Sequence, residues 1–506
     1  MSKVKANIID RAVSFFSPSA GYKRLQYRDA MNLFEGAGRS RRTAGWKTPS
    51  TSIQADTRRG LALLRSRARD LGQNNAYAAA AHRELPANII GTGLVPHPDL
   101  PDPDARAPFE QLIKRWFGTP ACDADNRLNF YGLQNLATKT VVESGEVLIV
   151  KRPRMAGNTG IPLQVQVMEP DHIDTLKDGV LNHDNGNVII QGVEFDRQGQ
   201  RVAYWLFDHH PGDQFYRFTN LTSRRVPADA VQHMFRLDRA GQVRGVPWGA
   251  PVIITLRDFD EFEDAQLVRQ KIAACFSVFI TPGEQFGPNR STDDDTERLL
   301  PEKVEPGIIE ELRDGKDVKF ANPPGVQGYG EYSTISMHKI ATGYGVPFSV
   351  LTGDLRQVNF SSGRMGDRAF NRNVMHWQRN LVIPQMCQPV WDWFMEAAVA
   401  ARQIREPIPA RWSPPRRELT DPAREIPAIR DAVRSMLITH PEAIRQQGFD
   451  PDDVVREAED WNKSIDEARL VTDSDPRKVS ANGLTQARPE GTEIPSTEVN
   501  DDETNE

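Results

Sequence analysis

The clearest candidate for catalysis in this sequence is the neighbouring pair Asp171 and His172, in the segment EPDHID. A carboxylate beside an imidazole can orient and polarise a general base, as hydrolases require. The pair falls at the end of a predicted strand, but the chain contains no G-x-S-x-G elbow that would supply the nucleophile of a triad. A hydrolase is therefore a hypothesis that these two residues alone support.

Two other clusters carry metal-ligating residue types. His209 and His210 lie next to Asp208 and close to Asp213, and residues 293–297 read DDDTE. The adjacent histidines point to opposite faces of a strand and lack the i, i+4 spacing of two zinc ligands on a helix. The DDDTE run lacks the spaced carboxylates and central glycine of a calcium loop. We predict a strand-end pair and a solvated charge run, with no metal and no cofactor.

Glycine-rich segments are candidates for phosphate binding. Residues 346–366 read VPFSVLTGDLRQVNFSSGRMG, with no lysine near a helix N-terminus, and the chain lacks G-x-x-x-x-G-K-[ST]. Gly91 and Gly93 follow a predicted helix and lack the third glycine of a dinucleotide fingerprint. No segment forms a convincing active site, which favours a structural or interaction role and predicts that the protein is not an enzyme.

Composition narrows the classes further. With 39% hydrophobic and 26% charged residues, the chain has the composition of an ordinary globular protein. Its net charge of -6 argues against a protein that coats nucleic acid along its whole surface. Basic residues gather locally in GRSRRTAGWK, residues 38–47, and in TRRG, residues 57–60. This N-terminal arm is either a solvated segment or one that contacts nucleic acid or an acidic partner.

The cysteines and the apolar runs bear on the compartment. Cys122, Cys275 and Cys387 form no C-x-x-C motif and no disulfide framework, so we expect a reducing cytoplasm. The apolar stretch 272–280 is far shorter than the ~20 residues that a membrane span needs. The N-terminus lacks the apolar core of a signal peptide, and we expect no membrane association.

The hydrophobic pattern predicts helices followed by strands, and hence the α+β class. One helical face in residues 52–90 consists of Leu61, Leu64, Ala68 and Leu71. We expect Arg65, Arg67 and Arg69 on the other faces. Residues 137–235 read as a small mixed sheet, in which residues 187–207 form two strands around a turn at residues 196–199.

Two further helices are predicted near the middle of the chain. A helix from Pro251 to Cys275 would be about 37 Å long, and residues 331–345 predict a second one. The first helix carries a run of acidic residues: Asp258, Asp260, Glu261, Glu263 and Asp264. A helix of this length and polarity requires neighbours on several sides, which copies of the same chain could supply.

The C-terminal third is predicted to be helical until about residue 470. Between residues 363 and 403 the apolar stripe changes phase at Pro384, which removes an amide hydrogen bond and should kink the helix. Three short helices follow within residues 420–470. Beyond Val471 the chain is rich in Pro, Ser, Thr and Glu, and we predict a disordered acidic tail.

Several of these segments together resemble the lambda-type portal proteins of tailed bacteriophages. The match is collinear over roughly residues 5–465. It is carried by LRSRARDLGQNNAYAAAA with NIIGTG, by SGEVLIVK, by TDPAREIPAIRDAV and above all by MHKIATGYGVPFSVLTGDLRQVNFSSGRMGDRAFNR. Each segment alone is a weak signal, whereas their order and spacing are specific.

The resemblance implies a ring, usually of twelve subunits, at one vertex of the viral capsid. It implies the following parts: an N-terminal basic arm (1–50), a wing (51–250), a stem helix (251–275), a clip (276–330), a second stem helix (331–345), a tunnel loop (346–362), a kinked wing helix (363–403), crown helices (404–470) and the acidic tail (471–506). The implied partners are double-stranded DNA, the terminase large subunit, the major capsid protein with its scaffold, and a head–tail adaptor. The implied location is the virion, after assembly in the bacterial cytoplasm.

The same resemblance implies which side chains meet DNA. The loop from residue 351 to 362 would line a constriction, with short polar or charged side chains facing the DNA: Thr352, Asp354, Arg356, Gln357, Asn359 and Ser361. Candidate channel-facing acids of the stem are Asp258, Asp260, Glu261 and Asp264. The alternatives are a soluble nucleic-acid-binding scaffold that uses the N-terminal arginines and, less favoured, the hydrolase.

Overall fold

The computed structural model describes residues 8–31, 45, 50–100, 103–182, 186–213, 222–275, 279–282, 316–319, 328–356, 358–415, 421–470, 472 and 477. The chain divides into two units, residues 1–56 and 57–506. The first unit contains α1 (Ile8–Phe16) and α2 (Pro18–Met31), and α3 (Ile53–Thr57) lies at the boundary. Among the described residues, no helix combines the length and the apolar character that a bilayer crossing requires. The DDDTE run lies outside the described residues.

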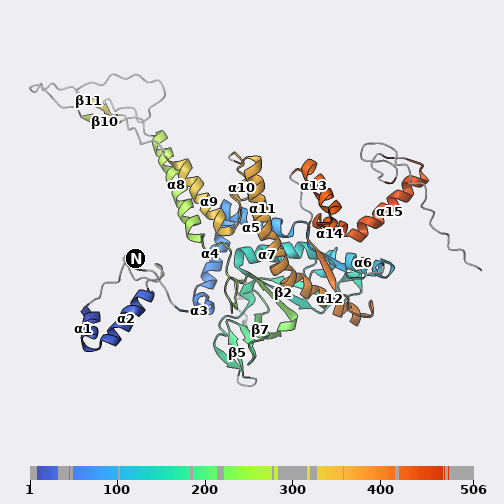
Figure 1. The fold of residues 1–506 in the computed structure, drawn as a ribbon, viewed down its shortest axis with the longest axis horizontal. Coiled ribbons are helices and arrows are strands. Elements are labelled where there is room, and N and C mark those ends of the chain that lie inside the picture. The colour runs from blue at the N-terminus through green and yellow to red at the C-terminus, as the bar shows by residue number, and fades with distance from the viewer. Residues whose placement is uncertain are drawn as a thin grey trace, which may run out of the picture. The chain divides into compact units, whose positions relative to one another are not determined.

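A layer of helices opens the second unit (Figure 1). It consists of α4 (Leu61–Asn74), α5 (Ala76–Ile90), α6 (Pro103–Phe117) and α7 (Phe130–Ser144). Asn75 separates α4 from α5, because its side chain accepts a hydrogen bond from the backbone N–H of Ala78 and so caps α5. The break between the two helices therefore falls at Asn74 and Asn75, and Gly72 stays inside α4.

One strand, β2, divides the interior into two cores. It is the middle strand of a three-stranded sheet with the order β3 (Gln164–Met168), β2 (Glu146–Arg152), β9 (Val231–Phe235). Val147 and Ile149 pack into the main core against the helices, and Leu148 and Val150 pack into a second core. This alternation follows from the twofold period of a strand, and it leaves β2 buried on both faces.

A second sheet covers the far side of the smaller core. Its strands follow one another in chain order as β4 (Val180–Asn182), β5 (Asn187–Ile190), β6 (Val193–Phe195), β7 (Arg201–Phe207) and β8 (Ser223–Pro227). Both sheets are antiparallel, so the prediction of a mixed sheet was wrong. Residues 187–207 form three strands rather than two, because Gln191 and Gly192 both take positive φ and make a tight turn. The α+β class is confirmed.

Aromatic side chains fill the centre of the main core. Trp116 and Phe117 of α6 meet Phe130 of α7 and Trp391 and Phe394 of α12 (Gln388–Ala400). The closest pair, Trp116 and Phe117, has ring centroids 4.7 Å apart. The indole N–H groups of Trp116 and Trp391 donate to backbone carbonyls at 2.9 and 2.7 Å, so these tryptophans are buried without an unpaired donor.

Two long helices, α8 (Ile253–Cys275) and α9 (Tyr329–Tyr344), extend side by side from this body (Figure 1). Phe262 of α8 lies between Tyr329 and Tyr332 of α9, with ring centroids 6.0 and 4.5 Å away. Of the region predicted as a clip, the structure describes the antiparallel pair β10 (Phe279–Pro282) and β11 (Lys316–Lys319) and the start of α9.

The chain then returns to the body through α10 (Phe348–Thr352) and α11 (Phe360–Trp377). The π-helical segment η8 (Gln378–Cys387) joins α11 to α12 and contains Pro384. The two predicted apolar stripes are buried. One runs from Phe370 to Leu381, before Pro384, and the other runs from Cys387 to Ala398, after Pro384. The wider π-helical turn accounts for the change of phase, because it adds a residue to the helical repeat.

The last helices are α13 (Pro422–Arg434), α14 (His440–Gln446) and α15 (Pro451–Glu467). β12 (Ala410–Ser413) precedes them and pairs with β1 (Val95–Pro98). Ion pairs join this region to the body: Asp450 lies 2.8 Å from His97, and Asp452 lies 2.7 Å from Arg106. Three helices were predicted here and three are present; the predicted tail is described only at residues 472 and 477.

A glycine substitution tests the turn that leads into β2. Gly145 has φ +91°, and an added Cβ would lie 2.4 Å from the backbone carbon of Val246. Gly199 has a similar φ of +81° but no neighbour within 4 Å. We expect Gly199→Ala to cost about 1 kcal/mol of unfolding free energy. Gly145→Ala should cost about 3 kcal/mol or more, because backbone must also move. Urea denaturation measures both, and equal losses would contradict the close approach.

Candidate functional site

Most of the predicted site residues lie on the connection between α10 and α11. Gly353, with φ +68°, ends α10, and the Asn359 side chain accepts a hydrogen bond from the backbone N–H of Ser362 at 2.7 Å. The Ser362 hydroxyl accepts one from Asn359 in return, which completes a capping box. The loop is therefore Gly353–Asn359, shorter than the predicted 351–362, because Thr352 still belongs to α10 and Ser361 already belongs to α11.

The charged residues of this loop neutralise each other. The guanidinium of Arg356 donates two hydrogen bonds to the Asp354 carboxylate, at 3.0 and 2.8 Å, and the Arg356 backbone N–H donates a third at 3.0 Å. The side-chain hydrogen bond from Arg356 lowers the pKa of Asp354 to about 2. The Arg356 side chain is 87% exposed, so the pair presents a guanidinium whose charge is largely balanced.

The other predicted loop residues have local roles. The Thr352 hydroxyl donates to the carbonyl of Phe348 and accepts from the N–H of Asp354. Asn359 is committed to its cap. Gln357 and the side chain of Ser361 lie outside the described residues. Among its described residues, the loop exposes the side chain of Arg356 together with the apolar side chains of Leu355 and Val358.

The acidic residues of α8 fall on different faces. Asp258, Glu261 and Asp264 are exposed. Asp260 is half-buried and accepts a hydrogen bond at 2.7 Å from the side chain of Asn75, at the start of α5. The Asp260 carboxylate is therefore used within the chain, and the channel-facing position of the four acids stays a prediction. Arg257 pairs with Glu261 at 3.0 Å and offsets part of the remaining charge.

The same two helices leave apolar side chains in solvent. Ile254 on α8 is 70% exposed and Ile335 on α9 is 68% exposed. Leu267 and Val268 near the end of α8, and Tyr332 on α9, are also exposed. Large exposed apolar side chains on projecting helices are candidates for contact with another protein.

The structure does not bring Asp171 and His172 together as a catalytic pair. The Asp171 carboxylate accepts hydrogen bonds from Arg65 at 3.3 Å and from Arg69 at 2.5 Å. Burial alone would raise the pKa of Asp171, but these guanidinium groups hold it below its usual range. His172 Nδ1 lies 3.0 Å from the backbone carbonyl of Phe207. Both side chains therefore hold the strand end in place.

In the part of the chain that the structure describes, two groups of acids and histidines lie close enough to share an ion. In one, donor atoms of Glu169, Asp171 and His210 lie within 4.8 Å of one another. Arg69 already occupies this group, because its Nη2 lies 2.8 Å from Glu169 and 2.5 Å from Asp171. The other group, His97 with Asp450 and Asp453, forms part of the ion pairs that join α15 to the body.

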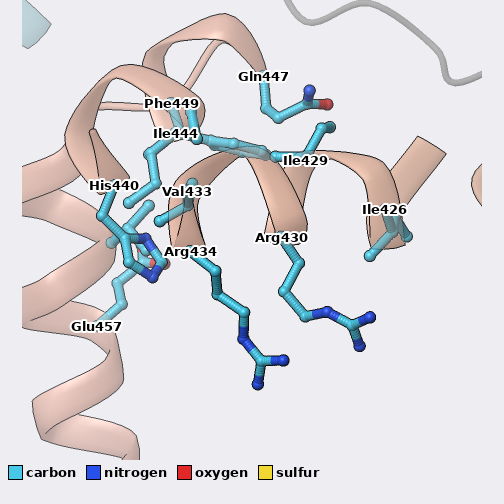
Figure 2. Close-up of a pocket in the computed structure, with 12 residues that line it drawn as sticks. Ile426, Ile429, Arg430, Val433, Arg434, His440, Ile444, Gln447, Phe449 and Glu457 are labelled. Atoms are coloured by element: carbon cyan, nitrogen blue, oxygen red, sulfur yellow. The ribbon is translucent and has the colours of Figure 1, made fainter. Parts of the chain in front are cut away.

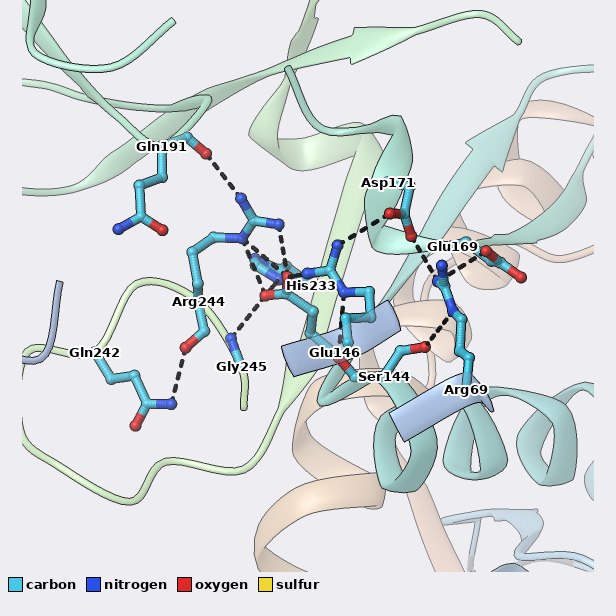
Figure 3. A network of polar contacts seen from close by, with 11 residues as sticks. Arg69, Ser144, Glu146, Glu169, Asp171, Gln191, His233, Gln242, Arg244 and Gly245 are labelled. Atoms are coloured by element: carbon cyan, nitrogen blue, oxygen red, sulfur yellow. Dashed lines mark hydrogen bonds and ion pairs between the residues drawn. The ribbon is translucent and has the colours of Figure 1, made fainter. Parts of the chain in front are cut away.

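Figure 3 shows a buried cluster of ion pairs centred on Glu146, the first residue of β2. Its carboxylate accepts hydrogen bonds from Arg244 at 2.6 to 3.1 Å and from Arg65 at 2.7 Å. The Nε2 atom of His233 lies 2.9 Å away, and the backbone N–H of Gly245 donates at 2.7 Å. Four partners surround one carboxylate from which solvent is excluded.

This cluster connects several helices and strands through the Glu146 carboxylate. Arg65 comes from α4 and His233 from β9, and Arg244 also donates to the carbonyl of Gln191 in the five-stranded sheet. Burial alone would raise the pKa of Glu146, but Arg244, His233 and Arg65 hold it well below its usual range. Burial lowers the pKa of His233 to about 4, so its imidazole is neutral at pH 7. A neutral histidine then serves as a hydrogen-bond donor to the carboxylate.

Sequence reasoning missed this cluster and placed Arg65 on the solvent side of its helix. Arg65 is in fact buried on the same face as Leu61, Ala68 and Leu71. A signal was present in the sequence, because position 65 follows Leu61 by four residues and precedes Ala68 by three. A charged residue inside an apolar stripe predicts a buried partner, which in this protein is Glu146.

Comparison with known proteins identifies the family to which the chain belongs. A family model described as "Phage portal protein, lambda family" matches residues 39–378, more than half of the chain. The chain belongs to the lambda family of phage portal proteins. Membership places the protein in a phage virion.

Individual portal proteins align over most of this one. A probable portal protein of Halomonas phage phiHAP-1 is 27% identical over 498 residues, which cover 93% of this chain and 92% of that one. Portal protein B of Escherichia phage lambda is 21% identical over 413 residues, covering 75% and 76%. A solved chain from the neck of a native gene transfer agent particle, computed with C12 symmetry, covers 81% of this chain and 98% of its own, at 14% identity and a TM-score of 0.46.

Removing the charge of Glu146 should be far more damaging than removing a surface charge. We expect Glu146→Gln to lower the unfolding free energy by about 3–5 kcal/mol, because two buried guanidinium groups lose their counter-ion. The matched control is Glu261→Gln, which breaks the exposed pair with Arg257 and should cost less than about 1 kcal/mol. Denaturant midpoints of both variants test this. A loss at Glu146 as small as that at Glu261 would show that the cluster is not a stabilising centre.

Proposed function

We propose that this portal protein assembles into a closed ring of twelve copies at one vertex of a phage capsid, and that double-stranded DNA enters and leaves through the central channel. The observation that carries the proposal is the exposed apolar surface of α8 and α9, which contains Ile254 and Ile335. Helices in a ring have a neighbour on each side, so this surface would be buried between copies. Head-to-tail contacts that close on themselves produce such a ring without exposed ends.

The loop Gly353–Asn359 is suited to a constriction through which DNA moves. Strong phosphate binding releases counter-ions and would hold DNA in place. In this loop the only described basic side chain, that of Arg356, is balanced by Asp354. Repeated around a ring, the loop would offer apolar and nearly neutral groups to the phosphate backbone. Such contacts are weak and independent of base sequence.

The exposed acids of α8 fit the same role. Asp258, Glu261 and Asp264 would repeat in each copy along the stem. A channel wall of negative charge repels the phosphate backbone and keeps DNA from adhering. Asp260 is left out of this surface, because it pairs with Asn75.

The remaining expectations from the family complete the proposal. The ring would assemble in the bacterial cytoplasm with the major capsid protein and scaffold, and would dock the terminase large subunit and later a head–tail adaptor. The π-helical turn at Pro384 would allow the long helical run α11–η8–α12 to bend while both its apolar stripes stay buried. The protein would serve as a conduit and a platform rather than as an enzyme.

Charged substitutions on the stem test the ring. We expect the double variant Ile254→Asp and Ile335→Asp to sediment as a monomer, because carboxylates cannot be buried unpaired between copies. Wild-type protein should sediment as a large ring. The control is Leu176→Asp, at a side chain 89% exposed next to the five-stranded sheet, and it should also form rings. Rings formed equally well by the double variant would contradict the proposed interface.

A second test addresses the loop. Asp354→Asn leaves Arg356 without its counter-ion in every copy. We expect rings of this variant to bind double-stranded DNA more tightly at low salt, with a steeper fall in affinity as salt rises. The control is Asp208→Asn, which frees Arg224 on the five-stranded sheet in the same way. Fluorescence anisotropy of labelled DNA over a salt series gives both slopes. If the two variants behave alike, the loop does not face DNA.

A further inference from the structure

The three C-terminal helices enclose an open apolar pocket of about 670 Å³ (Figure 2). Its walls are formed by aliphatic and aromatic side chains of α13, of α14 with the turn after it, and of α15: Ile426, Ile429, Val433, Ile444, Phe449 and Val454. Ile426 is 57% exposed and Phe449 is 46% exposed. A concave surface with this lining has the character of a binding site for apolar side chains.

The rim of the pocket is basic on one side. Arg430 and Arg434 extend from α13 beside the apolar wall, and His440 and Glu457 lie at the other end (Figure 2). Among the residues that the structure describes, Arg430 has one ion-pair partner, its exposed neighbour Asp431 at 3.3 Å, and Arg434 has none. The pocket lining therefore contains the two guanidinium groups of Arg430 and Arg434 and one carboxylate, that of Glu457. The fitting occupant carries apolar side chains flanked by acidic ones.

The last eighteen residues of the chain have this composition. Residues 489–506 read PEGTEIPSTEVNDDETNE, with seven acidic residues and no basic one. Their two large aliphatic side chains are Ile494 and Val499, each directly preceded by a glutamate. The two aliphatic side chains of the segment match the apolar wall of the pocket, and its carboxylates match the basic rim.

The segment is also within reach. Arg477 pairs with Asp466 at 3.2 Å, so the chain turns back against α15 after that helix ends. The twelve residues from Arg477 to Pro489 can span about 40 Å. Glu457, which lines the pocket, lies only about 14 Å from Asp466 along the same helix. The connection is long enough without any change in the helices.

We propose that residues 489–506 dock in the pocket between α13, α14 and α15 of their own chain, with Ile494 and Val499 against the apolar wall and the flanking carboxylates against Arg430 and Arg434. The docked segment covers the apolar hollow of the C-terminal helices and can be displaced by another acidic, apolar segment. The proposal does not depend on the ring, because every element of it lies within one chain.

Hydrogen–deuterium exchange on the full chain tests the contact. Full-length protein is compared with a variant that ends at Arg488. We expect faster exchange across α14 and the turn to Phe449 in the shortened chain, and recovery when a synthetic peptide of residues 489–506 is added. Exchange that is unchanged by the truncation would overturn the proposal and would indicate that another surface, such as a second copy, covers the pocket.

Anisotropy of the labelled peptide on the shortened chain then tests each half of the contact. We expect the double variant Arg430→Glu and Arg434→Glu to bind at least about tenfold more weakly, since two charge pairs are reversed. The charge-matched control, Arg67→Glu with Arg83→Glu on the body, should bind as wild type. A peptide with Ile494→Asp and Val499→Asp leaves the protein unchanged and should also bind at least about tenfold more weakly. The proposal would be overturned if all the protein variants bound the peptide equally well, or if the two peptides bound the shortened chain equally well.

Discussion

A pair of helices that projects from a protein cannot bury apolar side chains on all its sides within one chain, and the rest of this architecture depends on that constraint. α8 and α9 use Phe262, Tyr329 and Tyr332 to hold each other, which leaves Ile254 and Ile335 in water. Burying such groups is favourable at roughly 25 cal/mol per Å². Copies placed side by side around an axis would supply the missing contact surface. A ring of copies is the arrangement that we propose for this lambda-family portal protein.

A projecting pair of helices also needs a rigid base, and the cluster around Glu146 provides one. Asn75 and Asp260 join the base of α8 to the start of α5, while Arg65 fixes α4 to β2 through the buried carboxylate. Arg244 carries the same connection into the five-stranded sheet. A buried ionic cluster adds little net stability compared with apolar packing, but it is costly to break and it specifies one arrangement.

The sequence predicted α4, α5, α8, α9, the three C-terminal helices and the α+β class because apolar periodicity and cap residues are local signals. The change of phase at Pro384 was predicted correctly for this reason. The sequence did not predict α1, α2 or α6, and residues 137–144, which end α7, were assigned to the sheet. The buried role of Arg65 and the inward turn of Asp260 were not predicted, since their partners lie 81 and 185 residues away in the chain. The loop 353–359 lies within the predicted range of 351–362. The predicted range was too long because the capping box of Asn359 and Ser362 was not recognised in the sequence. The predicted disorder of the acidic tail stays a prediction, because the structure describes only residues 472 and 477 of that segment.

An electron cryo-microscopy reconstruction of the purified full-length protein would test the ring most directly. We predict a closed ring with a hollow axis. In it, Ile254 and Ile335 contact a neighbouring copy and the loop 353–359 lines the narrowest part of the channel. A monomer with α8 and α9 folded onto its own body would contradict this arrangement, as would a ring that leaves those two isoleucines in solvent.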